Sequence, residues 1–281
     1  MITLDTLNAA TPDAFAAALD GVFEHAPWVP LAAAPARPFA TVTALHDALM
    51  DVIRLADADT QRRFLRGHPP LSAAALAGGL TADSRAEQTA LGLAGLGAAA
   101  ADFTARAAAY TAAFGIPFII CARRHTPSSV LRTLERRLAS TEAAERDAAL
   151  HEVHYITRLR LVARATGPGI PRTTGHLSTH VLDTARGCPA GGVRIELLRD
   201  GVLLRDGITN QDGHLAEPLI AGEPLRIGPH ELRFHVGPYF ATTDAPWQDL
   251  IPVRFFVTEP EGHYNMPLLV TPWQYTTYRA G

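Results

Sequence analysis

The sequence predicts two domains of different classes, an all-α helical bundle followed by an all-β sandwich. Alanine marks the division, because residues 1–165 hold 42 alanines and residues 166–281 hold only 7. Alanine has the highest helix propensity, whereas the second half shows the short alternating apolar and polar runs of strands. Between them, the glycines and prolines of residues 167–171 cannot continue a helix. We therefore expect a helical domain at 1–165, an exposed linker at 166–175 and a β-sandwich at 176–281.

Composition excludes several classes of partner. The 281 residues carry a formal net charge of −3, so no basic field is available to attract nucleic acid or an anionic membrane surface. A basic leader followed by an apolar run is missing, as is an apolar stretch long enough to span a bilayer, and we expect a cytoplasmic protein. The two cysteines, Cys121 and Cys188, lie one in each half without metal-ligand spacing. We expect neither a disulfide nor a bound metal.

Helix starts in the first half follow one pattern. Thr11, Thr126 and Thr141 are each followed by proline or glutamate. A threonine hydroxyl caps the first turn, and proline or an acidic residue suits the positions after it. The pattern predicts helices that open after each threonine, the last of them running to about residue 165. Apolar residues at helical spacing predict two more, at 43–58 and 98–114.

A few polar residues interrupt the apolar pattern. His68 stands directly before two prolines, which force extended or turn backbone and place the imidazole on a loop. That histidine suits proton transfer, but an exposed loop histidine explains it equally well. Ser84 and Glu87 have the spacing of a helix-capping box, and Arg160 could belong to a solvated arginine face. Physical reasoning alone therefore leaves the function of this half open.

Five short segments of this half stand out together: APWV at 26–29, GHPPL at 67–71, LTADSRAEQ at 80–88, FGIPFIICARR at 114–124 and ITRLRL at 156–161. In this order they resemble the 2-oxo-4-hydroxy-4-carboxy-5-ureidoimidazoline (OHCU) decarboxylases of urate breakdown. The resemblance implies the catalytic residues His68, Ser84, Glu87 and Arg160. It implies substrate contacts at Pro69, Gln88, Phe118 and Ile119.

The activity implied by this resemblance requires no cofactor. The substrate carboxylate lies β to an imine nitrogen, so the electrons left by departing CO2 delocalise into the ring. The protein must then supply orientation and protons. A histidine paired with a carboxylate, here His68 with Glu87, exchanges a proton with the substrate, while Arg160 holds an anionic or carbonyl oxygen.

The second half has the pattern of about seven or eight short strands. The segments 177–183, 192–198, 230–236 and 252–257 have strand length or alternate apolar with polar residues, as strands of a sheet with one solvated face do. TNQDGH at 209–214 predicts a tight turn, since Asp-Gly favours positive φ. Together these signals predict a β-sandwich.

His180 shares a strand face with Ser178 and Leu182, where a histidine often does no more than cover an exposed sheet. The order LSTHVLD, RGCPAGGVRIELL, TNQDG, PYF and MPLLVTPWQYTTYRAG nevertheless resembles 5-hydroxyisourate hydrolase, the transthyretin-related enzyme that produces the substrate of the decarboxylase. Fusion of the two families in this order resembles allantoin-synthase-type proteins. The resemblance implies a transthyretin-like sandwich that assembles as a homotetramer and binds a small purine-derived molecule.

Departures from the hydrolase pattern fall on the implied site. The chain keeps His180, Tyr278 and Arg279, but it has His214 in place of an arginine and Asn265 in place of a histidine. We expect a hydrolase-like domain that is altered or weakened. Two alternatives stay open: the domain is a non-catalytic oligomerisation or ligand-binding module, or both halves act on a modified purine-derived substrate in a biosynthetic pathway.

Overall fold

The computed structural model of this chain describes residues 1–71, 99–241 and 248–280. The chain divides into two compact units. The first comprises Met1–Arg123 and Val130–Thr173, and the second comprises Arg124–Ser129 and Thr174–Gly281. No described helix is long and apolar enough to cross a membrane.

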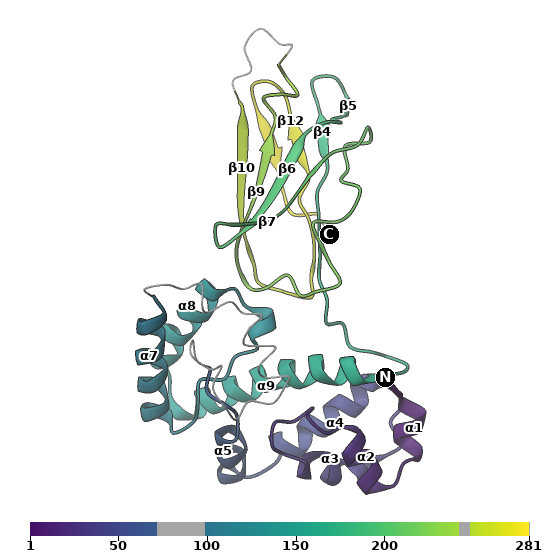
Figure 1. Cartoon of the computed structure of the whole chain (residues 1–281), viewed down its shortest axis with the longest axis vertical. Helices are drawn as coiled ribbons and strands as arrows, with labels where there is room; N and C mark the ends of the chain where they lie inside the picture. The colour runs from purple at the N-terminus through teal and green to yellow at the C-terminus, as the bar shows by residue number, and fades with distance from the viewer. Residues whose placement is uncertain (72–98, 242–247, 281) are drawn as a thin grey trace. The chain divides into compact units, whose positions relative to one another are not determined.

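Helices dominate the first unit (Figure 1). They are α1 (Leu4–Ala9), α2 (Pro12–Ala18), α3 (Trp28–Ala33), α4 (Val42–Arg54), α5 (Ala58–Arg66), α7 (Ala99–Phe114), α8 (Pro127–Leu138) and α9 (Glu142–Arg164), with short 3-10 turns at Ala34–Ala36 and Ala122–Arg124. The first residues of α8, up to Ser129, are grouped with the second unit. The three predicted threonine starts are confirmed. Thr11, Thr126 and Thr141 accept hydrogen bonds from the backbone N–H groups three residues further on. The capping signal therefore located these helix starts correctly.

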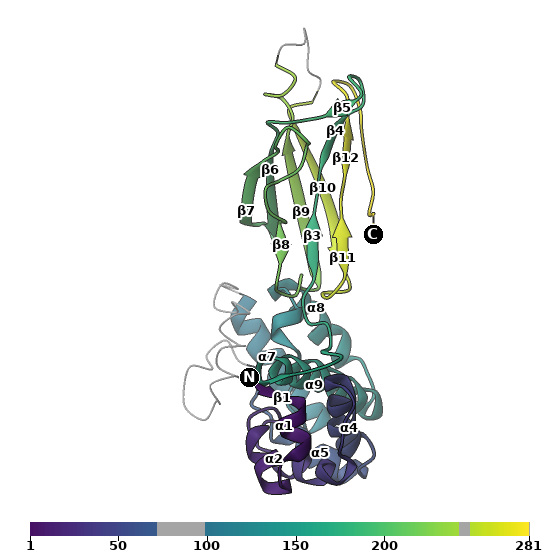
Figure 2. The ribbon, with the colours of Figure 1, turned by 90° about the vertical axis from the view of Figure 1, so that its right-hand side faces the viewer.

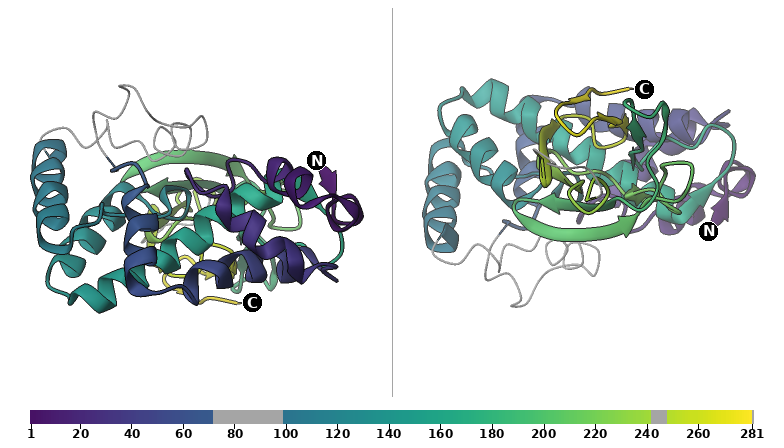
Figure 3. Two further views of the ribbon diagram at one scale, coloured as in Figure 1. Left: turned by 90° about the horizontal axis from the view of Figure 1, so that it is seen from below. Right: turned by 90° about the horizontal axis from the view of Figure 1, so that it is seen from above.

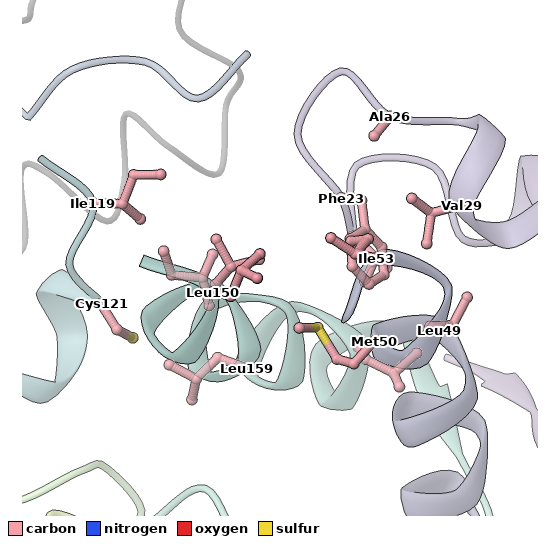
Figure 4. Close-up of a cluster of buried hydrophobic side chains, with 14 of the residues drawn as sticks. Phe23, Ala26, Val29, Leu49, Met50, Ile53, Ile119, Cys121, Leu150 and Leu159 are labelled. Atoms are coloured by element: carbon pink, nitrogen blue, oxygen red, sulfur yellow. The ribbon is translucent and has the colours of Figure 1, made fainter. Parts of the chain in front are cut away.

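The core of this unit lies around α4 and α9. In α4 the side chains of Leu45, Leu49 and Ile53 follow the helical repeat and are fully buried. α9 runs along most of the unit and packs against α4 and α5 (Figure 3). Figure 4 shows Met50 of α4 in the same apolar cluster as Leu159 of α9. This packing fixes the face of α9 that carries the buried Arg160.

The beginning of the predicted linker is part of the first unit instead. Residues Ala165–Thr166 form β2, which pairs in parallel with β1 (Ile2–Thr3). The carbonyl of Pro168 accepts a hydrogen bond from Val42 N, and that of Gly169 accepts one from Thr43 N. α9 ends at Arg164, before the glycines and prolines, and the carbonyls of Pro168 and Gly169 cap the first turn of α4. Pro168 and Gly169 are exposed, yet their carbonyls are hydrogen-bonded to the helical unit, which also contains a small strand pair.

Strands make up the second unit from Thr174 onwards, with no helix among the described residues of that stretch. One sheet has the order β10-β9-β6-β7 and is antiparallel. Its strands are β6 (Arg194–Arg199), β7 (Val202–Ile208), β9 (Gly228–His235) and β10 (Leu250–Val257). Alternate residues of β6 and β9, such as Ile195 and Phe234, are fully buried. This alternation places one face of the sheet on the core, as a sandwich requires.

The other sheet consists of shorter segments (Figure 2). They are β3 (His176–Ser178), β4 (Val181–Asp183), β5 (Cys188–Pro189), β8 (Ile220–Ala221), β11 (His263–Asn265), β12 (Leu268–Val270) and β13 (Tyr275–Thr277). β11 pairs with β3, and β12 with β4, both in parallel. Backbone bonds from Met266 N to Ser178 O, 3.0 Å, and from Leu268 N to His180 O, 2.9 Å, continue the ladder between these pairs. The two groups of segments are therefore one sheet.

This continuity explains why the expected seven or eight strands are observed as more segments. β3 and β4 are two halves of one extended stretch, interrupted at Thr179 and His180. β11 and β12 are interrupted at Met266 and Pro267, where proline lacks the N–H that a ladder needs. The interruption lies at His180, one of the predicted site residues.

Candidate active sites

His68 lies just past the end of α5, and it is buried rather than exposed. Only 7% of its surface is exposed. The backbone N–H of His68 donates to Leu65 O at 3.1 Å, so the residue continues the last turn before the prolines begin. Its ring packs edge-on against Phe64 at 4.9 Å, and Nδ1 lies 3.3 Å from Phe64 O. The alternative of an exposed loop histidine is wrong.

The surroundings of His68 favour its neutral form. Burial lowers its pKa to about 4, while the carbonyl of Phe64 and the charge of Glu24 oppose that shift and Arg160 adds to it. A carbonyl can only accept, so Nδ1 carries the proton and Nε2 holds the lone pair of the neutral ring. At neutral pH this histidine is a proton acceptor held in one tautomer.

Arg160 on α9 belongs to the same buried cluster. Its Nη1 donates to Glu24 Oε2 at 2.7 Å, and the Arg160 and Glu24 side chains are 5% and 1% exposed. Glu24 lies in the turns between α2 and α3, two residues before the start of the APWV segment. The sequence reasoning missed Glu24, although an acidic residue between the buried Phe23 and Ala26 was a usable signal.

The other decarboxylase residues divide into two groups. Ser84, Glu87 and Gln88 lie outside the described residues. Pro69 is half-buried beside His68. A pocket of about 320 Å³ lies next to this turn, lined among others by Glu24, Trp28, Phe64 and Gly67. The described part of the chain thus brings His68, Pro69 and Arg160 together with Glu24.

Phe118 and Ile119 lie on a buried segment after α7 that a charged network holds in place. Arg137 of α8 donates from Nη1 to Ile119 O at 2.8 Å, and its guanidinium lies 5.0 Å from the Phe118 ring centre. The same guanidinium donates from Nε to Glu145 Oε2 at 2.7 Å and from Nη2 to the Tyr110 hydroxyl at 2.9 Å. Since all three polar residues are buried, this network fixes the backbone of the predicted substrate contacts.

In the second unit, His180 and His214 meet as a pair of stacked rings. Their centroids are 5.0 Å apart with an interplanar angle of 18°. Gly213 has φ of 74°, as the predicted Asp-Gly turn requires, and places His214 opposite His180 as a bridge partner. Nδ1 of His214 lies 2.8 Å from Asp212 O, which leaves Nε2 without the proton in the neutral ring. Burial, and then the neighbouring His214, lower the pKa of His180.

Asn265 and the end of the chain lie near these rings. Asn265 Oδ1 accepts from the Ser178 hydroxyl at 3.4 Å, and its backbone exchanges two hydrogen bonds with Ala280. Ser178 and His214 line a pocket of about 180 Å³. Tyr278 is 53% exposed. The Arg279 guanidinium, in contrast, lies 3.9 Å from the ring centre of Tyr264.

Alternation along a strand explains the position of Arg279. Ala280 is paired with Asn265, and the preceding residue therefore points to the opposite face, where the buried Tyr264 lies. The structure thus brings His180, His214 and Asn265 together on one face and does not bring Arg279 to them. Among the described residues, no group of three or more histidine, cysteine or acidic side chains is arranged to hold a metal.

Comparison with known proteins defines the class of each half. Residues 8–162 match the OHCU decarboxylase family, and residues 177–280 match the HIUase/Transthyretin family. The chain belongs to the OHCU decarboxylase family in its first half and to the HIUase/transthyretin family in its second.

The particular relatives support both assignments. Over its whole length the chain resembles the crystal structure of (S)-allantoin synthase, with a TM-score of 0.55, 32% identity and 100% of both chains covered. The OHCU decarboxylase of Haloferax volcanii is 33% identical over 164 residues, which are 58% of this chain and 96% of that relative. The 5-hydroxyisourate hydrolase of Deinococcus radiodurans is 47% identical over 117 residues, which are 38% of this chain and 98% of that relative.

Proposed function

We propose that this chain degrades urate, with a first half that decarboxylates OHCU to (S)-allantoin and a second half that is an altered or weakened 5-hydroxyisourate hydrolase. The observation that carries the proposal is the buried, neutral His68 beside the ion pair of Glu24 and Arg160. This arrangement lies within the match to the OHCU decarboxylase family. His68 supplies a proton acceptor and Arg160 supplies a cation, and both are buried away from solvent, as decarboxylation of an anion requires.

Protons and charge move in a simple order in the proposed reaction. The bond between the ring carbon and its carboxylate breaks, CO2 leaves, and the electron pair passes into the imine nitrogen. His68 takes the proton of the substrate hydroxyl through Nε2 as that oxygen becomes a carbonyl. It returns the proton to the neighbouring ring carbon, which carries the ureido group, and this selects one allantoin enantiomer, while a proton from solvent completes the ring N–H. Arg160 holds an oxygen of the substrate, and Ser84, Glu87 and Gln88 complete the set that the family resemblance implies. The ring itself is the electron sink, so the proposed step needs no cofactor.

For the second half, the supporting observation is that His180, His214 and Asn265 share one face. Water attack on a ring carbonyl needs a base and a donor for the oxyanion. Burial lowers the pKa of His180, which favours its neutral, proton-accepting form, whereas Asn265 can donate but cannot take a proton. The site therefore retains bases and lacks the permanent charge of a guanidinium, which is why we propose slow ring opening.

A second candidate function follows from the same face. With Arg279 over Tyr264 and asparagine at 265, the surface has hydrogen-bonding groups for a purine-derived ligand without a fixed cation. A binding or assembly module fits this composition. The scaffold alone does not decide between catalysis and binding.

We also propose that the second half assembles the protein into a homotetramer. β10 is an edge strand of its sheet, and its Leu250 and Phe256 are 41% and 49% exposed. β13 is the edge strand of the other sheet. Uncovered edges with apolar side chains invite pairing with another copy of the same strand. Light scattering at micromolar concentration should give four copies, and a monomer would remove this proposal.

One experiment separates the proposed activities. Freshly generated 5-hydroxyisourate is given to the full chain, to His68→Ala and to His180→Ala, with ring opening followed by absorbance and (S)-allantoin by circular dichroism. His68→Ala should open the ring at the rate of the unaltered chain and form racemic allantoin only at the spontaneous rate. His180→Ala should lose any catalysed ring opening while it still decarboxylates added OHCU. Full (S)-allantoin formation by His68→Ala would refute the decarboxylase assignment.

A further inference from the structure

Glu24 is a buried acidic residue to which neither the sequence motifs nor the family resemblance assigned a role. Its side chain is 1% exposed, in a turn where the neighbouring Val22 and Phe23 are also buried. An ionised carboxylate is costly to bury unless it is paired, and even a paired one often stabilises a fold no better than apolar residues would. A stabilising role is therefore a poor explanation for this pair.

The contacts of Glu24 are directed at two proposed catalytic residues. Oε2 accepts from Arg160 Nη1 at 2.7 Å, and Gly21 O lies 3.4 Å from the same nitrogen. These two oxygens, from the turns before α3, restrict the guanidinium that α9 contributes. The arginine side chain is long and has several rotatable bonds. The contacts that hold Nη1 therefore restrict the orientation of the planar guanidinium group.

Glu24 also sets the charge that His68 experiences. The groups facing His68 from the described elements are the Phe64 carbonyl on α5, Glu24 and His25 on the α2–α3 turns, and Arg160 on α9. Of these side chains, Glu24 raises the pKa of His68, whereas Arg160 and His25 lower it. Glu24 thus opposes the effect of the Arg160 charge on the histidine.

We propose that Glu24 is a positioning residue of the decarboxylase, which orients the Arg160 guanidinium toward the substrate anion and balances its charge beside His68. This inference rests on the proposed function and deepens it. Glu24 acts through Arg160 and His68 and needs no contact with the substrate. Its two effects can be tested separately. The orientation of Arg160 depends on the length of the Glu24 side chain, whereas the effect on His68 depends on its negative charge.

The charge effect has a defined sign. Catalysis by neutral His68 is lost as the pH falls through the pKa of this group, which is about 4. Glu24→Gln removes a negative charge that raises this pKa, so the low-pH limb of the activity profile should move to lower pH. Glu24→Asp keeps the charge but is one methylene shorter, so the limb should stay in place while turnover falls.

The test uses the full chain with OHCU formed in the cuvette by a urate oxidase and an excess of a separate 5-hydroxyisourate hydrolase. (S)-Allantoin is followed by circular dichroism between pH 3.5 and 8, with the coupling enzymes replaced by pre-formed OHCU where they fail. We expect Glu24→Gln to lose about 10- to 100-fold in kcat/KM, the scale of a misplaced substrate-holding group. Asp47→Asn, which removes an exposed carboxylate from α4, is the matched control and should behave as the unaltered chain.

Each outcome decides the inference. A loss of kcat/KM in both folded Glu24 variants, with the limb displaced only in Glu24→Gln, supports it. A folded Glu24→Gln with unchanged kcat/KM and an unmoved limb overturns it. Should Glu24→Gln not fold, Glu24→Asp decides, and its full activity would refute the positioning role. Absence of decarboxylation by the unaltered chain would instead refute the proposed function, and this inference with it.

Discussion

The two candidate sites present their histidines in opposite ways. His68 is 7% exposed and lies beside the buried ion pair of Glu24 and Arg160. His180 is half-buried, and its partner His214 is an exposed residue of a turn. In the helical unit, charged side chains are buried and paired with side chains of opposite charge. In the sheet, alternation leaves one face open, and the two imidazole rings stack on it.

This difference has a physical cause. A helix bundle surrounds its site with side chains from several elements, so an acid, an arginine and a histidine can meet away from water. A sheet offers only one face, so the corresponding residues depend on a further layer to exclude water. The helical site should therefore be sensitive to loss of any buried charge, whereas the sheet site, which is open on one face, should tolerate substitutions better.

The largest effect should come from breaking a buried ion pair of the helical unit. Glu145→Gln leaves Arg137 buried without its anion, and we expect the free energy of unfolding to fall by about 3 to 5 kcal/mol. Arg254→Gln in the sheet breaks a pair whose arginine is 82% exposed, and should cost about 1 kcal/mol or less. Urea titrations of both variants, with separate probes of helix and sheet, measure the contrast. Equal losses would show that burial does not distinguish the two units.

Second in size is the loss of activity when His68 is replaced by alanine. We expect the decarboxylation rate to fall by about 100-fold or more, the scale for losing a group that transfers protons. His151→Ala, on the exposed face of α9, is the matched control and should retain full activity. Near-normal turnover by folded His68→Ala would remove this histidine from the mechanism.

Third is the repair of the sheet site. We expect hydroxyisourate hydrolysis by the unaltered chain at least about 100-fold below decarboxylation, since a proton-transfer group and an oxyanion donor are both replaced. The double variant His214→Arg with Asn265→His should raise the hydrolysis rate, as judged by absorbance. Fast hydrolysis without any gain from the double variant would show that the stacked histidines form a competent site of their own.

The smallest effect concerns the stacked pair itself. Burial lowers the pKa of His180 first and His214 lowers it further, so His214→Ala should move the pKa of His180 upward part of the way to its ordinary value. His176→Ala, on the same strand face but packed against His263, should leave it unchanged. Histidine ring signals followed by NMR between pH 4 and 8 give both values. No movement in His214→Ala would mean that the rings are not coupled.

Much of the fold was readable from local patterns. The alanine content and the threonine caps predicted the helical half, and Thr141 begins α9 where expected. The Asp-Gly turn before His214 was also predicted. The positive φ of Gly213 depends only on a few neighbouring residues, so a short local motif is enough to indicate it. The contacts of the predicted linker were not readable in the same way, since glycine and proline exclude a helix but do not show where their carbonyls bind.

The candidate sites were predicted less completely. His68 and Arg160 came from motifs, but their meeting through Glu24 depends on residues 136 positions apart and was not readable from spacing. Likewise, the segment of Ile119 gave no sign that Arg137 would hold its carbonyl. Such contacts are set by packing between elements, which no local pattern encodes.

From its residues alone, this chain could be assigned two fold classes, its helix starts, its turns and the motifs of two families. Those features depend on backbone propensities and spacings within a few residues. The burial of His68, the anchoring of Arg160 by Glu24, the stacking of His180 on His214 and the turning of Arg279 onto Tyr264 were decided only by the tertiary structure. Each depends on elements distant in the sequence, which bury a side chain in the low-dielectric interior or, through the pleat of a sheet, select what it faces.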